Sequence, residues 1–158
     1  MKTPPELPMA LLANRVFKAC EADFFEALGD EGYTDIRMRH TALFEALDED
    51  GTRGSVLAER LGMTQQAMAQ LLDDTQAAGY ITRIPDPTDR RARVVMLTDR
   101  GQAAVELCYA LLTRIEREYA RLLDDGDEYS SLKRGLTRLL NTLASRTETT
   151  APAKPDTY

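Results

Sequence analysis

Two groups of polar side chains in the middle of the chain could take part in molecular recognition. The segment from Thr64 to Gln70 carries three glutamines, and a glutamine amide can bond the N6 and N7 atoms of adenine together. The segment from Arg83 to Arg93 carries four arginines against Asp86 and Asp89, so it has a local positive charge suited to phosphate oxygens. These residue types indicate that the two segments bind another molecule through its bases or phosphates.

Catalytic and metal chemistry are not expected. The chain has one histidine, and it lacks a GxSxG nucleophile motif, a glycine-rich phosphate loop and any metal-ligand spacing. We therefore expect no enzyme, no metal and no cofactor. Cys20 and Cys108 lie far apart within helical patterns, where a cysteine is usually a small, inert apolar residue. A redox role for Cys20 stays open as the less favoured interpretation.

The elements that position the glutamines read as a helix, a turn and a second helix. Leu57, Ala58 and Leu61 form the apolar face of the first helix, and Gly62 ends it. Thr64 is a suitable N-cap for the second helix, whose predicted buried residues are Met68, Leu71, Leu72 and Thr75. The opposite, polar face is the candidate reading face, formed by Thr64, Gln65, Gln66, Ala69 and Gln70.

Two strands are expected to carry the arginines. Gly79 follows the last periodic residue of the second helix, a common helix end. Residues 80–84 and 93–97 are rich in branched and aromatic side chains, as strands are, and residues 85–91 between them are turn formers followed by positive charge. A helix-turn-helix followed by a basic hairpin predicts a winged helix, a mainly α fold of the α+β type.

Further helices are predicted on both sides of this module, over residues 9–28, 34–47, 99–123 and 128–145. The first helix and the last two have apolar stripes that a winged helix does not need for its own core. These stripes either fold back on one another or pair with a second copy of the chain. We expect a flexible arm (1–8), an N-terminal dimerisation helix (9–33), a DNA-binding module (34–101), C-terminal dimerisation helices (102–146) and a disordered tail (147–158).

The net charge of −6 does not exclude a nucleic-acid partner, because the charge is unevenly distributed. Residues 1–50 hold 5 basic and 11 acidic groups, whereas residues 51–101 hold 7 and 6. The acidic helices can therefore point away from phosphates. The chain has no run of about 18 apolar residues and no apolar core of a signal peptide near its start. We expect a cytoplasmic protein without a membrane partner.

The residues LAERLGMTQQAM (57–68), GYITRIPDPTDRRARVVMLT (79–98) and the following Asp-Arg-Gly (99–101) resemble the MarR family of bacterial transcription regulators. The Asp89-x-Arg91 pair and the LTxxG ending are its most specific marks. The resemblance implies a winged-helix homodimer that binds a pseudo-palindromic operator in double-stranded DNA. It further implies that Arg91 enters the minor groove and that Asp89 orients its side chain.

Other arginines are expected to contact phosphates, which position a protein without specifying a sequence. Arg90 and Arg93 lie in the hairpin, while Arg37, Arg39 and Arg53 precede or begin helices in the same module. For these last three, an ordinary solvated arginine is an equally good interpretation.

The resemblance also implies an effector, a small aromatic or anionic molecule bound between the winged helix and the dimer helices. His40 is the best candidate for its pocket, followed by Tyr33 and Phe44. A lone histidine on an apolar stripe is more often a satisfied interior group. The overall prediction is a homodimeric repressor released by an effector. The alternatives are a winged helix that binds only proteins, which suits the acidic total, and a regulator that senses redox state through Cys20.

Overall fold

The computed structural model of this chain describes residues 7–89, 91–123 and 127–150, the side chains of 147–150 excepted. It divides into two compact units, one ending at Ile115 and the other beginning at Glu116. The first unit contains α1 (Met9–Asp30), α2 (Met38–Glu45), β1 (Thr52–Arg53), α3 (Gly54–Arg60), α4 (Gln65–Ala77), β2 (Ile81–Pro85), β3 (Arg93–Leu97) and most of α5 (Asp99–Leu122). The end of α5 and the helix α6 (Asp127–Thr150) belong to the second.

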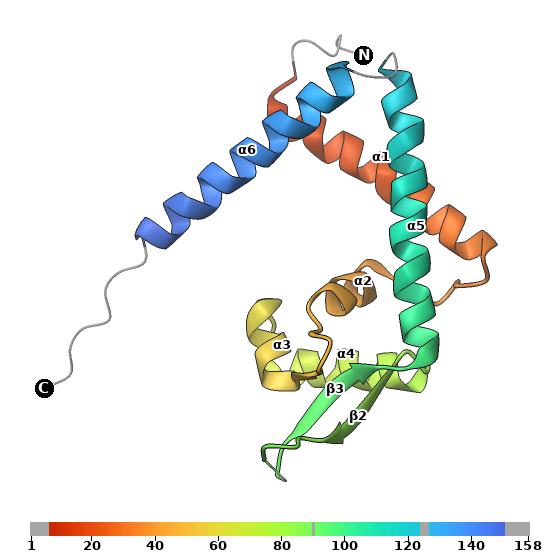
Figure 1. The fold of residues 1–158 in the computed structure, drawn as a ribbon, viewed down its shortest axis with the longest axis vertical. Coiled ribbons are helices and arrows are strands. Elements are labelled where there is room, and N and C mark those ends of the chain that lie inside the picture. Colours follow the sequence, from red (N-terminus) through yellow and green to blue (C-terminus); the bar gives the residue numbers. More distant parts are fainter. Residues whose placement is uncertain (1–6, 90, 124–126, 151–158) are drawn as a thin grey trace, which may run out of the picture. The chain divides into compact units, whose positions relative to one another are not determined.

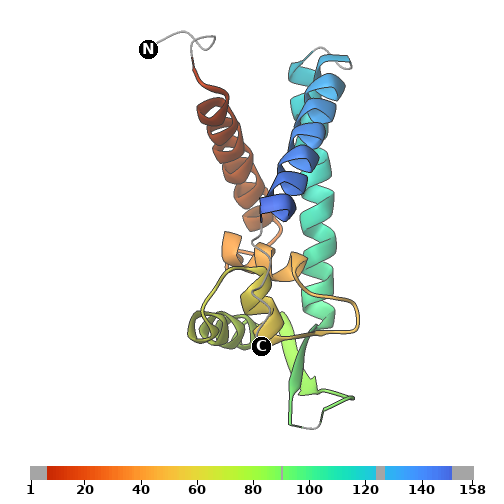
Figure 2. The same ribbon diagram turned by 90° about the vertical axis from the view of Figure 1, so that its left-hand side faces the viewer.

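Helices α3 and α4 and a small sheet form the predicted winged helix (Figure 1). Strand β3 lies between β1 and β2, and both pairings are antiparallel. In the β2–β3 hairpin, Ile81 pairs with Leu97 and Pro85 with Arg93. The sequence did not predict β1, because two residues are too few to show alternation. Viewed from the side, the hairpin reaches beyond α3 and α4 (Figure 2).

The core of the module is aliphatic and draws on α2, α3, α4 and the sheet. Its buried members are Leu43, Leu57, Ala58, Met68, Leu71, Leu72, Ile81 and Val95. The predicted buried face of α4 is confirmed, including Thr75, whose hydroxyl donates to the Leu71 carbonyl at 2.6 Å. The hydroxyl of Thr64 accepts from the Ala67 N–H at 3.2 Å, so the predicted N-cap is also confirmed.

The second helix begins later than predicted. Thr34 does not cap it, because α2 starts at Met38 with Arg37 in an extended conformation at its N-cap. His40 Nδ1 accepts from the Arg37 backbone N–H at 3.0 Å, which satisfies that donor at the helix start. Ile36, predicted within the helix, lies before it and is nevertheless fully buried. Burial periodicity alone did not distinguish a packed loop from a helical turn.

Helices α1, α5 and α6 carry most of the exposed apolar surface. Of the predicted stripe on α1, Phe24 is buried, whereas Leu12 and Val16 are exposed. On α6, Leu132, Leu136, Leu139 and Leu143 are all exposed. Among the described residues, the large exposed apolar side chains outside these three helices are Met38 and Ile84. The winged helix thus has its own core, and the flanking helices carry exposed apolar side chains.

The last helix is longer than the composition suggested. Helix α6 runs to Thr150, so residues 147–150, which were predicted to begin the tail, are helical. Residues 1–6 of the predicted arm, the acidic break at 124–126 and residues 151–158 of the predicted tail lie outside the described residues. Within the second unit, Lys133 forms an ion pair with Glu116 of α5. No helix in the described part of the chain combines the length and apolar character needed to cross a membrane.

Candidate nucleic-acid interface

The candidate reading face lies exposed along the first two turns of α4. Thr64, Gln65, Gln66, Ala69 and Gln70 are all exposed, opposite the buried Met68, Leu71 and Leu72. The Gln70 amide donates to Asp74 at 2.9 Å, so its donor is already engaged. The side chains of Gln65 and Gln66 make no hydrogen bond among the described residues, and their amides are therefore available to a ligand.

The Asp86 carboxylate stabilises the base of the hairpin tip, although its residue type alone did not mark it as functional. Asp86 is buried, and its Oδ1 accepts from the backbone N–H of Thr88 at 2.7 Å and from its hydroxyl at 2.6 Å. Its Oδ2 accepts from Arg53 Nε at 2.7 Å. The bonds from Thr88, followed by that from Arg53, hold the pKa of Asp86 well below its ordinary value. The Asp-x-Thr spacing of a side-chain turn was the available signal.

Asp89 makes a different contact from the one that the family resemblance implied. Its Oδ1 accepts from the backbone N–H of Arg91 at 3.0 Å, and its Oδ2 lies 4.0 Å from the Arg53 guanidinium. Asp89 thus fixes the backbone at Arg91, whose side chain is exposed. Arg90 lies outside the described residues, and Arg93 is exposed at the start of β3. Because the backbone at Arg91 is already fixed, it would lose less conformational entropy when Arg91 binds a partner.

The three arginines outside the hairpin all have partners within the chain. Arg37 donates to the carbonyls of Thr34 and Ile36 at 2.6 and 2.8 Å. Arg39 lies 3.8 Å from Asp74, and Arg53 is held by Asp86. Their roles as phosphate ligands remain predictions.

A fourth ion pair joins the reading helix to the hairpin. Arg83 on β2 contacts Asp73 on α4 at 2.7 Å. Two nitrogens of the same guanidinium, Nε and Nη2, are buried without a hydrogen-bond partner among the described residues. The pair thus links the two elements that would meet DNA, and a purely local reading of the sequence could not place it.

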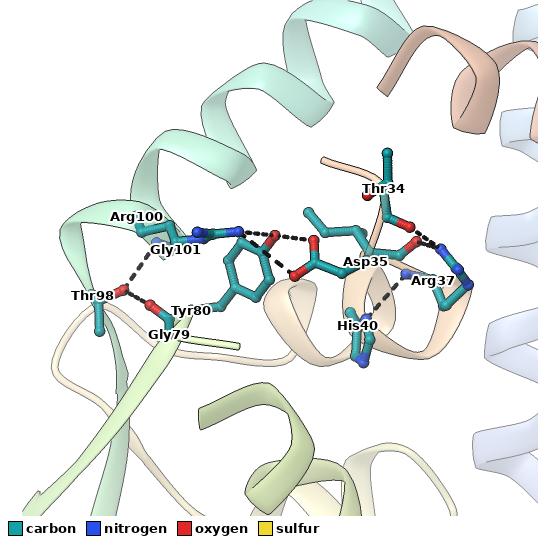
Figure 3. A network of polar contacts seen from close by, with 10 residues as sticks. Thr34, Asp35, Arg37, His40, Gly79, Tyr80, Thr98, Arg100 and Gly101 are labelled. Atoms are coloured by element: carbon teal, nitrogen blue, oxygen red, sulfur yellow. Dashed lines mark hydrogen bonds and ion pairs between the residues drawn. The ribbon is translucent and has the colours of Figure 1, made fainter. Parts of the chain in front are cut away.

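Tyr80 occupies the junction between α4, the sheet and α5 (Figure 3). Its side chain is completely buried, its hydroxyl donates to Asp35 at 2.6 Å, and Arg100 donates to the same hydroxyl at 3.1 Å. The Arg100 guanidinium also lies 4.7 Å from the ring centroid and 3.6 Å from Asp35. Burial, followed by the bond to Asp35, raises the pKa of Tyr80, so the phenol keeps its proton.

The LTxxG ending of the hairpin has a physical explanation at this junction. The Thr98 hydroxyl donates to the Gly79 carbonyl at 2.6 Å and accepts from the Gly101 N–H at 3.0 Å, which caps α5 (Figure 3). A Cβ on Gly101 would lie 2.0 Å from the Tyr80 carbonyl oxygen. Residue 101 must therefore be glycine for α5 to start against the end of α4, where Gly79 has a φ of +82°.

A cavity of about 210 Å³ lies between α1, α2 and α5 in the first unit. Its lining is mostly apolar and includes four aromatic residues, Phe17, Phe24, Phe44 and Tyr109. Of the predicted pocket residues, Phe44 lines it, whereas His40 and Tyr33 do not. Tyr33 packs near the Tyr80 ring at 6.3 Å, and His40 is buried at the start of α2.

His40 and the two cysteines of this region have environments that favour their neutral forms. Burial, followed by the charge of Arg39, lowers the pKa of His40, which agrees with its Nδ1 acting as an acceptor. Burial raises the pKa of both Cys20 and Cys108, which line the cavity. A thiol with a raised pKa has less of the reactive thiolate, so these environments favour the packing interpretation of both cysteines.

The winged-helix module is similar to known proteins. A family model for the MarR family matches residues 32–92, from the loop before α2 to the hairpin tip. The helix-turn-helix and hairpin of this chain are thus similar to those of the MarR family of transcription regulators, as the residues in the reading helix and hairpin indicated.

Individual proteins and solved structures show the same similarity. The chain is 31% identical over 85 residues to the multiple antibiotic resistance protein MarR of Escherichia coli, a match that covers 53% of this chain and 58% of that protein. The crystal structure of apo MarR from E. coli superposes with a TM-score of 0.66 at 25% identity, covering 85% of this chain and 98% of the other. CouR from Rhodococcus jostii, bound to p-coumaroyl-CoA, shares the fold with a TM-score of 0.65 at 17% identity, over 99% and 100% of the two chains.

Proposed function

We propose that this protein is a regulator of the MarR family, a homodimeric, sequence-specific DNA-binding repressor that a small molecule releases from its operator. The observation that carries the proposal is the pairing of two exposed recognition elements on one module with its own core. These are the glutamine face of α4 and the arginine hairpin, which the Arg83–Asp73 and Arg53–Asp86 ion pairs brace.

Each element suits a different groove of DNA. An exposed helix fits the major groove, where Gln65 or Gln66 can bond adenine and Ala69 can contact a thymine methyl group. The Arg91 side chain at the hairpin tip fits a narrow minor groove, where the negative potential is concentrated. The other predicted contacts remain part of the proposal, with Arg90 and Arg93 on phosphates and with Arg37, Arg39 and Arg53 as weaker candidates.

A second copy of the chain is the proposed cover for the apolar stripes. Leu11, Val16 and Phe17 of α1 are each at least half exposed, and contiguous apolar surface of this kind marks an interaction site. We assign residues 34–101 to DNA binding and the helices of 9–33 and 102–146 to dimerisation. A two-fold dimer would set two reading helices about 34 Å apart, which matches one turn of B-DNA and a pseudo-palindromic operator.

The cavity between α1, α2 and α5 is the proposed effector site. Phe44 lines it, and the same ring lies 5.8 Å from the Tyr80 ring in an edge-on contact. Tyr80 in turn contacts the loop before α2 and the start of α5. A ligand that displaces Phe44 would therefore disturb the junction that sets the angle between α4 and α5.

Operator binding by an Arg91→Ala variant tests the function. Binding should weaken by roughly a hundredfold in a gel-shift assay, because two wings each lose a contact of about 1–3 kcal/mol. Arg114→Ala removes an equal charge from an exposed site on α5 and should leave the affinity nearly unchanged. Equal effects of the two substitutions would contradict a specific role for the hairpin.

The reading face is tested by selection from a randomised operator library. Gln66→Ala should change the preferred sequence while the total affinity for non-specific DNA stays similar. Failure of the wild-type protein to bind any duplex, together with a binding affinity that does not depend on salt, would instead support the alternative of a protein-binding winged helix.

A further inference from the structure

The charged groups that line the cavity are all acidic. Glu21 of α1 and Glu45 of α2 line it, and no lysine, arginine or histidine does. Glu21 is already paired with Lys18 at 2.7 Å. No ion pair or hydrogen bond to the Glu45 side chain occurs among the described residues, although this carboxylate lies near enough to Cys108 to add to the burial that raises the thiol pKa. Glu45, which is exposed, thus supplies a negative charge without a described partner beside an apolar cavity.

Like the Glu45 carboxylate, the aromatic rings that line the cavity attract a cation. Three of the four phenylalanines of the chain line the cavity together with Tyr109. The face of an aromatic ring attracts a cation, and several rings around one space recognise ammonium groups. One of these rings already shows that preference, because the Lys18 ammonium lies 5.8 Å from the Phe17 centroid.

We propose that the ligand of this cavity is a lipophilic organic cation, with an aromatic or aliphatic body and an ammonium group beside Glu45. The inference rests on the proposed effector site and specifies its ligand. An anion placed in the same cavity would meet the Glu45 carboxylate and ring faces, which both repel it, and it would find no basic lining side chain. The volume of about 210 Å³ suits a small molecule, such as one ring with a short arm.

Three probes with the same body and different end groups test the charge preference. These are phenylbutylammonium, phenylbutanol and phenylbutanoate, and their dissociation constants for the full-length protein are measured by isothermal titration calorimetry. The ammonium should bind most tightly and the carboxylate most weakly, with roughly tenfold or more between them. Binding of the carboxylate as tight as that of the ammonium, or binding of none of the probes, overturns the inference.

Substitutions locate the preference. Glu45→Gln should weaken binding of the ammonium probe by roughly fivefold or more. It should leave the affinity for the alcohol unchanged and raise the affinity for the carboxylate. Tyr109→Leu should weaken the ammonium more than the alcohol, because it keeps an apolar wall and removes a ring. Glu26→Gln removes an exposed acid of α1 that does not line the cavity, and it should change none of the three affinities. Equal effects of Glu45→Gln on all three probes contradict the proposed ammonium position.

Gel-shift measurements on the same protein separate this inference from the proposed function. Operator binding without discrimination among the probes refutes the cation site and leaves the DNA-binding function intact. If the protein discriminates among the probes but binds no DNA duplex, the cation site is supported and the proposed DNA-binding function is refuted. Release of bound operator by the ammonium probe, and not by the carboxylate, supports both.

Discussion

The Tyr80 junction and the cavity share one wall, the Phe44 ring, and differ in how their polar groups are satisfied. At the junction, the Tyr80 hydroxyl, Asp35 and Arg100 bond one another around a fully buried ring. At the cavity, the Glu45 carboxylate has no such partner within the described residues, and space remains between the side chains. The junction therefore holds its side chains in one arrangement, whereas the cavity has space and a carboxylate available to a ligand. The following substitutions test this difference.

The largest effect is expected where the junction has no room. Gly101→Ala places a Cβ 2.0 Å from the Tyr80 carbonyl oxygen, a backbone atom that cannot move alone. The free energy of unfolding in urea should fall by about 3 kcal/mol. Gly135→Ala in α6, where a Cβ would meet nothing within 4 Å, should instead raise it by roughly 0.5–1 kcal/mol. A small loss for Gly101→Ala would show that the junction can adjust.

The next effect compares two tyrosine hydroxyls. Tyr80→Phe removes both bonds of the buried phenol and should lower the free energy of unfolding by about 1–2 kcal/mol. Tyr109→Phe at the cavity removes a hydroxyl from an exposed residue and should change it by less than about 0.5 kcal/mol. Thermal or urea unfolding of the two variants gives the difference. Similar losses would mean that the cavity is as tightly organised as the junction.

A pH dependence should arise from His40, which lies beside the junction. Its pKa is lowered in the folded state, so folding favours the neutral imidazole. The stabilisation is complete above the unfolded value of about 6.5 and is lost as the pH falls below it toward the folded pKa. Between about pH 7.5 and 5.5 the wild type should lose more unfolding free energy than His40→Ala. Parallel losses in the two proteins would show that other groups cause the dependence.

The smallest effect is expected from the unpaired acid of the cavity. Glu45→Gln should leave the free energy of unfolding within about 0.5 kcal/mol of the wild type, because it breaks no described bond. Asp35→Asn at the junction, which weakens the contacts to Tyr80 and Arg100, should lower it by about 1 kcal/mol. A marked destabilisation by Glu45→Gln would reveal a structural role for this carboxylate and would weaken the comparison.

Local patterns were sufficient to predict the winged helix. The apolar spacing of Met68 and Leu71, the cap at Thr64 and the positive φ at Gly79 each depend on neighbours along the chain, and the structure confirms them. The predicted start of α2 was wrong because it also depended only on neighbours along the chain. Thr34 is a good local cap, but Arg37 and His40 form the actual helix start, and Ile36 is buried in a loop.

The candidate site was predicted in part. The exposed glutamines followed from helical periodicity, whereas the contacts of Asp86 to Arg53 and of Asp73 to Arg83 join residues whose partners are set by packing. His40 was the favoured pocket residue, yet it caps α2, and Phe44 lines the cavity. Both residues lie on one short helix, so which of them faces the space depended on how α1 and α5 pack against it.

The sequence by itself determined the order of the helices and of the two hairpin strands, the exposed face of the reading helix and the positive hairpin, because these properties follow from residue type and periodicity. The tertiary structure alone decided which arginines are held by acids, why residue 101 is glycine and that both charged lining residues of the cavity are acids. Such pairings join residues from different elements, and their distances are set only when those elements pack.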